Sequence, residues 1–94
     1  MNVGLCIAEI HLTAAHSLKE KRRVLHRLKD RLRGRFNVSL AEIDHQDLWQ
    51  RATLGIVAIS PARPPLESCF SQIRGILESE VPGDLVSFDV EYLT

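Results

Sequence analysis

Four histidines and a few carboxylates are the residues whose types could support metal binding or acid–base catalysis. No two histidines have the i,i+4 spacing with a third ligand nearby that a helical metal site needs. Glu9, His11 and Glu42 would converge only if the strands that carry them bring them to one sheet face; a polar network at the sheet edge is the alternative. We therefore predict no metal site and no catalytic residues, and an enzyme built on these three residues is our third hypothesis. The histidines are His11, His16, His26 and His45.

Two cysteines, Cys6 and Cys69, lie in apolar stretches without C-x-x-C spacing. Free buried thiols in a reducing cytoplasm explain them best, with a disulfide or metal role as the alternative. The sequence contains neither G-x-x-x-x-G-K-[ST] nor G-x-G-x-x-G, so we expect no glycine-rich phosphate loop and no cofactor. The first strand-like stretch contains Glu9 and His11, and no apolar run reaches membrane-spanning length. We predict a cytoplasmic protein without a membrane partner.

Basic residues are concentrated in one segment, Ser17–Arg35. It holds nine of the twelve Lys and Arg residues and only two of the twelve acids, although the formal net charge of the chain is zero. The segment therefore carries about +7 and the rest of the chain about −7 by formal count. Such a one-sided basic segment is a plausible phosphate-contacting surface, and a solvated surface without a ligand is the alternative.

The same segment is predicted to form a helix. Ser17 and Glu20 have the S-x-x-E spacing of a capping box, and Gly34 follows the last apolar residue, where a left-handed C′ residue is common. Leucines fall on one arc and cations on the adjacent arc. Lys21 lies within the apolar arc, and we expect its stem to follow the core edge while its ammonium stays in water. The residues predicted to contact RNA phosphates are Lys19, Lys21, Arg22, Arg23, Arg27, Lys29 and Arg33.

Alternating and helical periodicities continue along the chain. They predict strands over Asn2–Thr13, Phe36–Asp44, Ala52–Ser60 and Leu85–Leu93, and a second helix over Leu66–Ser79. The order βαββαβ is that of a ferredoxin-like α+β fold: a four-stranded antiparallel sheet with both helices on one face. Residues 1–94 would form a single domain, with the first and third strands at the centre of the sheet.

One sheet face is expected to pack against the helices and the other to stay open. The predicted helix-facing residues are Cys6, Ala8, Ile10, Leu12, Leu54, Ile56, Ala58, Val86, Phe88 and Val90. Apolar residues also occupy the open face, with polar Glu9, His11, Glu42, Asp89 and Glu91 around them. Such a cluster is rarely left in water, which favours a homodimer or a protein partner there. The predicted interface residues are Val3, Leu5, Ile7, Val57, Ile59 and Trp49, although Trp49 is also interpreted as a residue that closes the end of the core.

Three stretches together resemble one family. They are VGLCIAEIHL running into SLKEKRRVLHRLKDRLRGRFNVSLAEID, the loop HQDLWQRATLGIVAIS, and the closing strand. The chain is similar here to the YlxP-like family of small conserved bacterial proteins, a domain of unknown function. The resemblance implies a ferredoxin-like fold, and gene clusters shared with transcription and translation factors imply a role near RNA or the ribosome. It implies no catalytic residues.

The sequence thus leads to two main hypotheses. The first is a non-enzymatic cytoplasmic protein, associated with ribosomal or other structured RNA, that binds phosphates through the basic helix. The second is a protein-interaction or assembly module that forms a homodimer, or binds a partner, through the open apolar sheet face.

Overall fold

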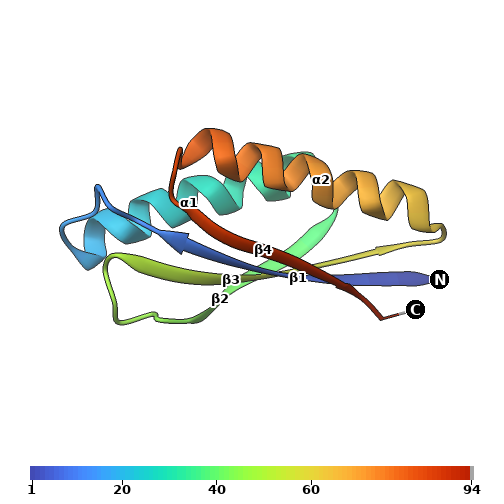
Figure 1. Ribbon diagram of the computed structural model, residues 1–94, viewed down its shortest axis with the longest axis horizontal. Helices are drawn as coiled ribbons and strands as arrows, with labels where there is room; N and C mark the ends of the chain where they lie inside the picture. The colour runs from blue at the N-terminus through green and yellow to red at the C-terminus, as the bar shows by residue number, and fades with distance from the viewer. Residues whose placement is uncertain (94) are drawn as a thin grey trace.

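The computed structural model describes residues 1–93 and confirms the predicted ferredoxin-like architecture. The four strands form one antiparallel sheet in the order β2-β3-β1-β4, so β1 and β3 are central. Both helices cover the same face of this sheet, and the other face is open (Figure 1). The elements are β1 (Asn2–His11), α1 (Leu18–Arg35), β2 (Val38–Asp44), β3 (Arg51–Ser60), α2 (Arg63–Glu80) and β4 (Leu85–Tyr92).

Helix α1 begins at the predicted cap but ends later than predicted. The Ser17 hydroxyl accepts a hydrogen bond from the Glu20 N–H at 3.1 Å. The Glu20 carboxylate accepts from the His16 N–H, one residue before the position that the usual capping box uses. The helix continues to Arg35, and Phe36 follows in an extended conformation. The prediction that Gly34 is a left-handed C′ residue is therefore wrong, since Gly34 lies inside α1.

The core lies between the sheet and the two helices. Helix α1 contributes Leu25, Leu28 and Leu32. Helix α2 contributes Leu66, Phe70, Ile73, Ile76 and Leu77. These pack on the predicted inner face of β1 and β3.

The two cysteines are free thiols. Burial is the main reason that the pKa of Cys6 is raised to about 12, with the Asp89 charge as a smaller cause. Burial also raises the pKa of Cys69. Both sulfurs therefore stay protonated at neutral pH.

Two β-bulges interrupt the alternation of faces in the sheet, and one of them overturns a predicted core residue. The pairing of β1 with β4 shifts between Glu9 and Ile10, and Leu85 rather than Val86 then packs towards the helices. Val86 is 57% exposed, so its predicted place in the core is wrong. In β2, the shift between Glu42 and Asp44 leaves Ile43 on the open face, over Gly55. A bulge inserts one residue and so reverses the alternation of faces beyond it.

The three residues of the hypothetical acid–histidine site do not come together. Glu42 pairs with Leu54 in the sheet and lies on the helix-facing side, which contradicts its predicted place around the open face. Glu9 stays on the open face, where it accepts hydrogen bonds from the Thr53 hydroxyl at 2.9 Å. Arg51 Nη2 lies 3.9 Å from Oε2 of the same carboxylate. Glu9 is thus part of a polar network on the sheet.

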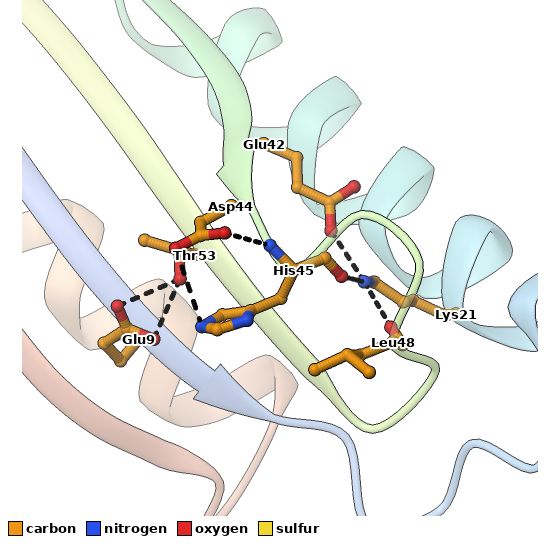
Figure 2. Close-up of polar contacts among 7 residues, drawn as sticks. All are labelled: Glu9, Lys21, Glu42, Asp44, His45, Leu48 and Thr53. Atoms are coloured by element: carbon orange, nitrogen blue, oxygen red, sulfur yellow. Dashed lines mark hydrogen bonds and ion pairs between the residues drawn. The ribbon is translucent and has the colours of Figure 1, made fainter.

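Lys21 is buried and fastens the β2–β3 loop to α1. Its side chain is 1% exposed, and its Nζ lies 2.7 Å from Glu42 Oε2. The same ammonium donates hydrogen bonds to the carbonyl oxygens of His45 at 2.6 Å and Leu48 at 2.5 Å (Figure 2). One cation therefore joins α1, the last part of β2 and both ends of a turn. The prediction that the Lys21 ammonium stays in water is wrong.

The turn that Lys21 binds has its own local structure. The Leu48 N–H donates to the His45 carbonyl at 3.0 Å, which closes the turn. His45 has a φ of 62°, a left-handed conformation that non-glycine residues adopt rarely. The Asp44 carboxylate accepts from the His45 N–H at 2.8 Å and supports this conformation. Without Lys21, the two carbonyl oxygens and the Glu42 carboxylate would lose their shared cation.

We predict that Lys21→Met lowers the free energy of unfolding by about 3–5 kcal/mol, because it leaves a buried carboxylate without its cation. Lys19→Met, on the exposed side of the same helical turn, should change it by less than about 0.5 kcal/mol. Replacing Glu42 by Leu in the Lys21→Met background should restore part of the loss, since the uncompensated charge is then gone. Urea denaturation measures all three. Equal stability of Lys21→Met and the wild type would contradict the role of Lys21 in fastening the β2–β3 loop to α1.

We predict opposite effects of alanine at two glycines. A Cβ at Gly4 would lie 2.4 Å from a ring carbon of Phe70, so Gly4→Ala should lower the free energy of unfolding by about 1–3 kcal/mol. A Cβ at Gly34 would meet open space inside α1, so Gly34→Ala should raise it by about 0.5–1 kcal/mol. Thermal unfolding of both variants checks this. A destabilised Gly34→Ala would instead indicate a left-handed residue there.

Candidate nucleic-acid interface

The outward side of α1 carries a band of basic side chains, which we call the basic band. Its members recur at three- and four-residue spacing, so they share one helix surface, adjacent to the arc of leucines. From the first to the last member the band extends about 21 Å along the helix, at 1.5 Å per residue. Its residues are Lys19, Arg22, Arg23, His26, Lys29 and Arg33. Of these, only His26 is absent from the predicted contacts, although it falls at nearly the same helical angle as Lys19 and Arg33.

Most cations of the basic band have no acidic partner. Within residues 1–93, no ion pair involves Lys19, Arg22, Arg23 or Lys29. Arg33 donates a hydrogen bond to the Leu40 carbonyl at 3.0 Å, which leaves its charge unneutralised. This part of the helix surface therefore keeps a local positive potential.

Two acids of α1 lie near the band without neutralising it. Asp30 lies among the cations and pairs with His26, its Oδ2 3.2 Å from the imidazole Nε2. Glu20 is on the side of the helix nearer to α2, and its carboxylate accepts from the His16 backbone. The band is therefore interrupted by one carboxylate, and that carboxylate already has a histidine partner.

Two of the predicted phosphate contacts lie outside the basic band. Arg27 turns towards α2, where its Nε lies 3.6 Å from Glu80 Oε2, and Arg31 pairs with the other oxygen of Glu80. These two arginines therefore join α1 to α2. Lys21 is buried under the β2–β3 loop, so the prediction that it contacts phosphates is wrong. The surface keeps five of the seven predicted residues together: Lys19, Arg22, Arg23, Lys29 and Arg33.

The open sheet face is the second candidate surface, and it lies on the side of the sheet away from α1 (Figure 1). Val57 is 40% exposed and Ile59 55% exposed, whereas Val3, Leu5 and Ile7 of β1 are half-buried. Two apolar residues outside the predicted interface are also exposed on strands of this sheet, Ile43 and Val86. Alternation alone already puts Ile43 with Ala41 on the face opposite Val38 and Leu40. Alternation could not place Val86, because it lies at the β-bulge of β4.

Trp49 is not part of the core. Its side chain is 44% exposed, so the interpretation that it closes the end of the core is wrong. The ring lies edge-on to the His16 ring, with 6.5 Å between ring centroids. His16 directly precedes the cap of α1, and Trp49 therefore lies at the N-terminal end of that helix rather than over the open sheet face.

Within residues 1–93, no three His, Cys, Asp or Glu side chains gather as a metal-binding group. Neither α1 nor α2 has the continuous apolar length that crossing a bilayer requires.

Comparisons with known proteins show which family the chain belongs to. Residues 3–90 match the model of a family described as "Protein of unknown function (DUF503)". An "Uncharacterized protein YlxP" of Bacillus subtilis (strain 168) is 40% identical over 77 residues, which cover 82% of this chain and 84% of that protein.

Two designed proteins share the fold at low sequence identity. The designed protein Foldit4 aligns with a TM-score of 0.61 at 12% identity, over 100% of this chain and 98% of its own. The design LFR1 1, described as having a ferredoxin fold, aligns with a TM-score of 0.59 at 14% identity, over 100% and 86%. These likenesses show the fold alone, whereas the family model and the Bacillus relative show kinship. The chain belongs to the DUF503 family, which includes YlxP.

Proposed function

We propose that this protein is a non-enzymatic cytoplasmic factor that binds structured RNA, such as ribosomal RNA, through the basic band of α1. The observation that carries this proposal is the row of cations without acidic partners on one rigid helix. Arg31 and Arg27 of the same helix do have an acidic partner, Glu80. The chain therefore neutralises the arginines beside α2 and leaves those facing solvent charged.

The chemistry of the band favours phosphates over base edges. Guanidinium and ammonium groups spaced along a helix contact successive phosphate oxygens and displace condensed counterions. Such contacts give affinity that falls steeply with salt and carry little sequence information. A factor of this kind would bind by the shape of its RNA.

We predict that the triple variant Arg22→Glu, Arg23→Glu and Lys29→Glu loses RNA binding. Sedimentation of the protein in cell extract should show wild-type protein with ribosomal particles at low salt and free protein at raised salt, because counterion release governs affinity. With purified RNA, the slope of log affinity against log salt should decrease by about two to three, near 0.7–0.9 per lost phosphate contact.

The matched control reverses the charge at three arginines outside α1, with the substitutions Arg51→Glu, Arg63→Glu and Arg74→Glu. This variant has the same net charge as the first, and it leaves the basic band intact. Arg63 and Arg74 already pair with acids one helical turn away. RNA binding by the control should stay close to the wild type. Equal loss in both variants, or retention in both, would contradict a site on the band.

The exposed apolar residues of the open sheet face favour a second candidate function, assembly of a homodimer through this face. Val57 and Ile59 project from central strand β3, next to the half-buried apolar side chains of β1. A second copy would bring the same apolar surface and remove both from water. The basic band belongs to α1, which lies on the other face of the sheet (Figure 1), so this function is compatible with RNA binding.

We predict that wild-type protein sediments as a dimer and that Ile59→Glu sediments as a monomer. The carboxylate would be buried without a partner at the centre of the interface, whereas the exposed position costs the folded monomer little. Ser71→Glu, exposed on α2, should leave the dimer intact. A wild type that stays monomeric at high concentration would contradict dimerisation through the sheet.

A further inference from the structure

Trp49 is an exposed aromatic residue that belongs neither to the basic band nor to the core. It is the only tryptophan in the chain, and nearly half of its side chain is in water. Its neighbour Leu48 is also exposed, at 42%, so the loop does not serve as a plug for the core. The loop is nevertheless fixed on α1 through the Leu48 carbonyl, which accepts a hydrogen bond from buried Lys21.

The turn that carries Trp49 contains groups whose burial or backbone conformation is energetically unfavourable, which is unexpected for a side chain without a ligand or partner. A buried cation, the buried Oε2 of Glu42 and a left-handed residue at His45 all hold the short turn that presents the Trp49 ring. The bond from Lys21 to the carbonyl immediately before Trp49 limits how far its backbone can move. An aromatic ring held outward on a fixed loop is preorganised for contact with a flat ligand.

The position of the ring relative to the charges indicates what that ligand is. The Trp49 ring contacts His16, which lies three residues before Lys19, the first cation of the basic band. A strand whose phosphates follow the band would therefore reach Trp49 at the N-terminal end of α1. Single-stranded nucleic acid is bound in this way, by a cationic track next to aromatic rings on which bases stack.

We infer that Trp49, flanked by His16, is a stacking site for an unpaired base of the RNA whose phosphates contact the basic band. This inference rests on the proposed function and extends it, because it names the preferred RNA as one with a single-stranded loop or end beside a helix. Stacking on indole accepts any base, so the site selects unpaired over paired nucleotides without selecting sequence. The His16 ring lies at a steep angle beside the indole, with 6.5 Å between the ring centroids, and it borders the same surface.

Intrinsic fluorescence tests the site directly, because a single tryptophan reports it. A six-nucleotide cytidine oligomer should quench the emission of Trp49 on binding. A 24-base-pair RNA duplex closed by a hairpin loop of flexible non-nucleotide linker at each end should bind the band without quenching, since its bases are already stacked. Quenching by both RNAs, or by neither when both bind, would overturn the inference.

Two variants complete the test. Trp49→Ala should weaken binding of the cytidine oligomer roughly 5- to 150-fold, the range for loss of one stacked base, and leave duplex affinity unchanged. Trp49→Phe should recover much of the oligomer affinity, because phenylalanine also stacks. Unchanged oligomer affinity in Trp49→Ala, or equal loss for oligomer and duplex, would contradict stacking.

The outcomes separate this inference from the proposed function. If the triple reversal of the band weakens both RNAs while Trp49→Ala weakens neither, the band binds RNA and the stacking site is wrong. If wild-type protein binds neither RNA at low salt, the proposed function fails and the inference fails with it. If Trp49→Ala instead dissociates a homodimer in sedimentation, the ring is an interface residue and the inference is overturned.

Discussion

The ion pair between Lys21 and Glu42, with the hydrogen bonds that the same ammonium donates, connects α1, β2 and the β2–β3 loop. The Lys21 ammonium joins α1 to Glu42 of β2 and to two carbonyl oxygens of the β2–β3 loop. A lone buried cation would be strongly unfavourable, so the fold requires all three partners at once. The direction of α1, the end of β2 and the shape of the loop are therefore determined together, and the basic band and Trp49 are held at fixed positions on either side of this contact.

Local patterns in the sequence were sufficient for the architecture. Alternation in β1 and β3 placed their inner faces correctly, and the Ser17–Glu20 spacing marked the start of α1. The features that failed depend on contacts between distant segments. The sequence indicated that Lys21 lies at the edge of the core with its ammonium in water, because nothing within α1 shows that two loop carbonyl oxygens accept hydrogen bonds from it. The prediction for Val86 was wrong because a β-bulge inserts one residue into β4 and reverses the alternation beyond it, and bulges depend on the neighbouring strand.

In the candidate site too, the residues set by local pattern could be predicted, and those set by contacts between elements could not. Helical periodicity alone brings Lys19, Arg22, Arg23, Lys29 and Arg33 to one surface, and it also points to His26. The partners of Arg27 and the position of Trp49 could not be predicted in this way, since Glu80 and His16 lie on other elements. The alternation that turns Val38 and Leu40 towards the helices would have placed Glu42 there too, so that error was avoidable. Its pairing with Lys21 was not visible in the sequence.

Because both helices cover one face of the sheet, the helix that carries the basic band and the open apolar face lie on opposite sides of the sheet. Two copies joined through their open faces would form four layers, with a helical layer on each outside and one α1 on each outer surface. The two basic helices of such an assembly would face away from each other and could not bind the same short duplex. The assembly would be bivalent, and its avidity would depend on whether one large RNA presents two sites around it.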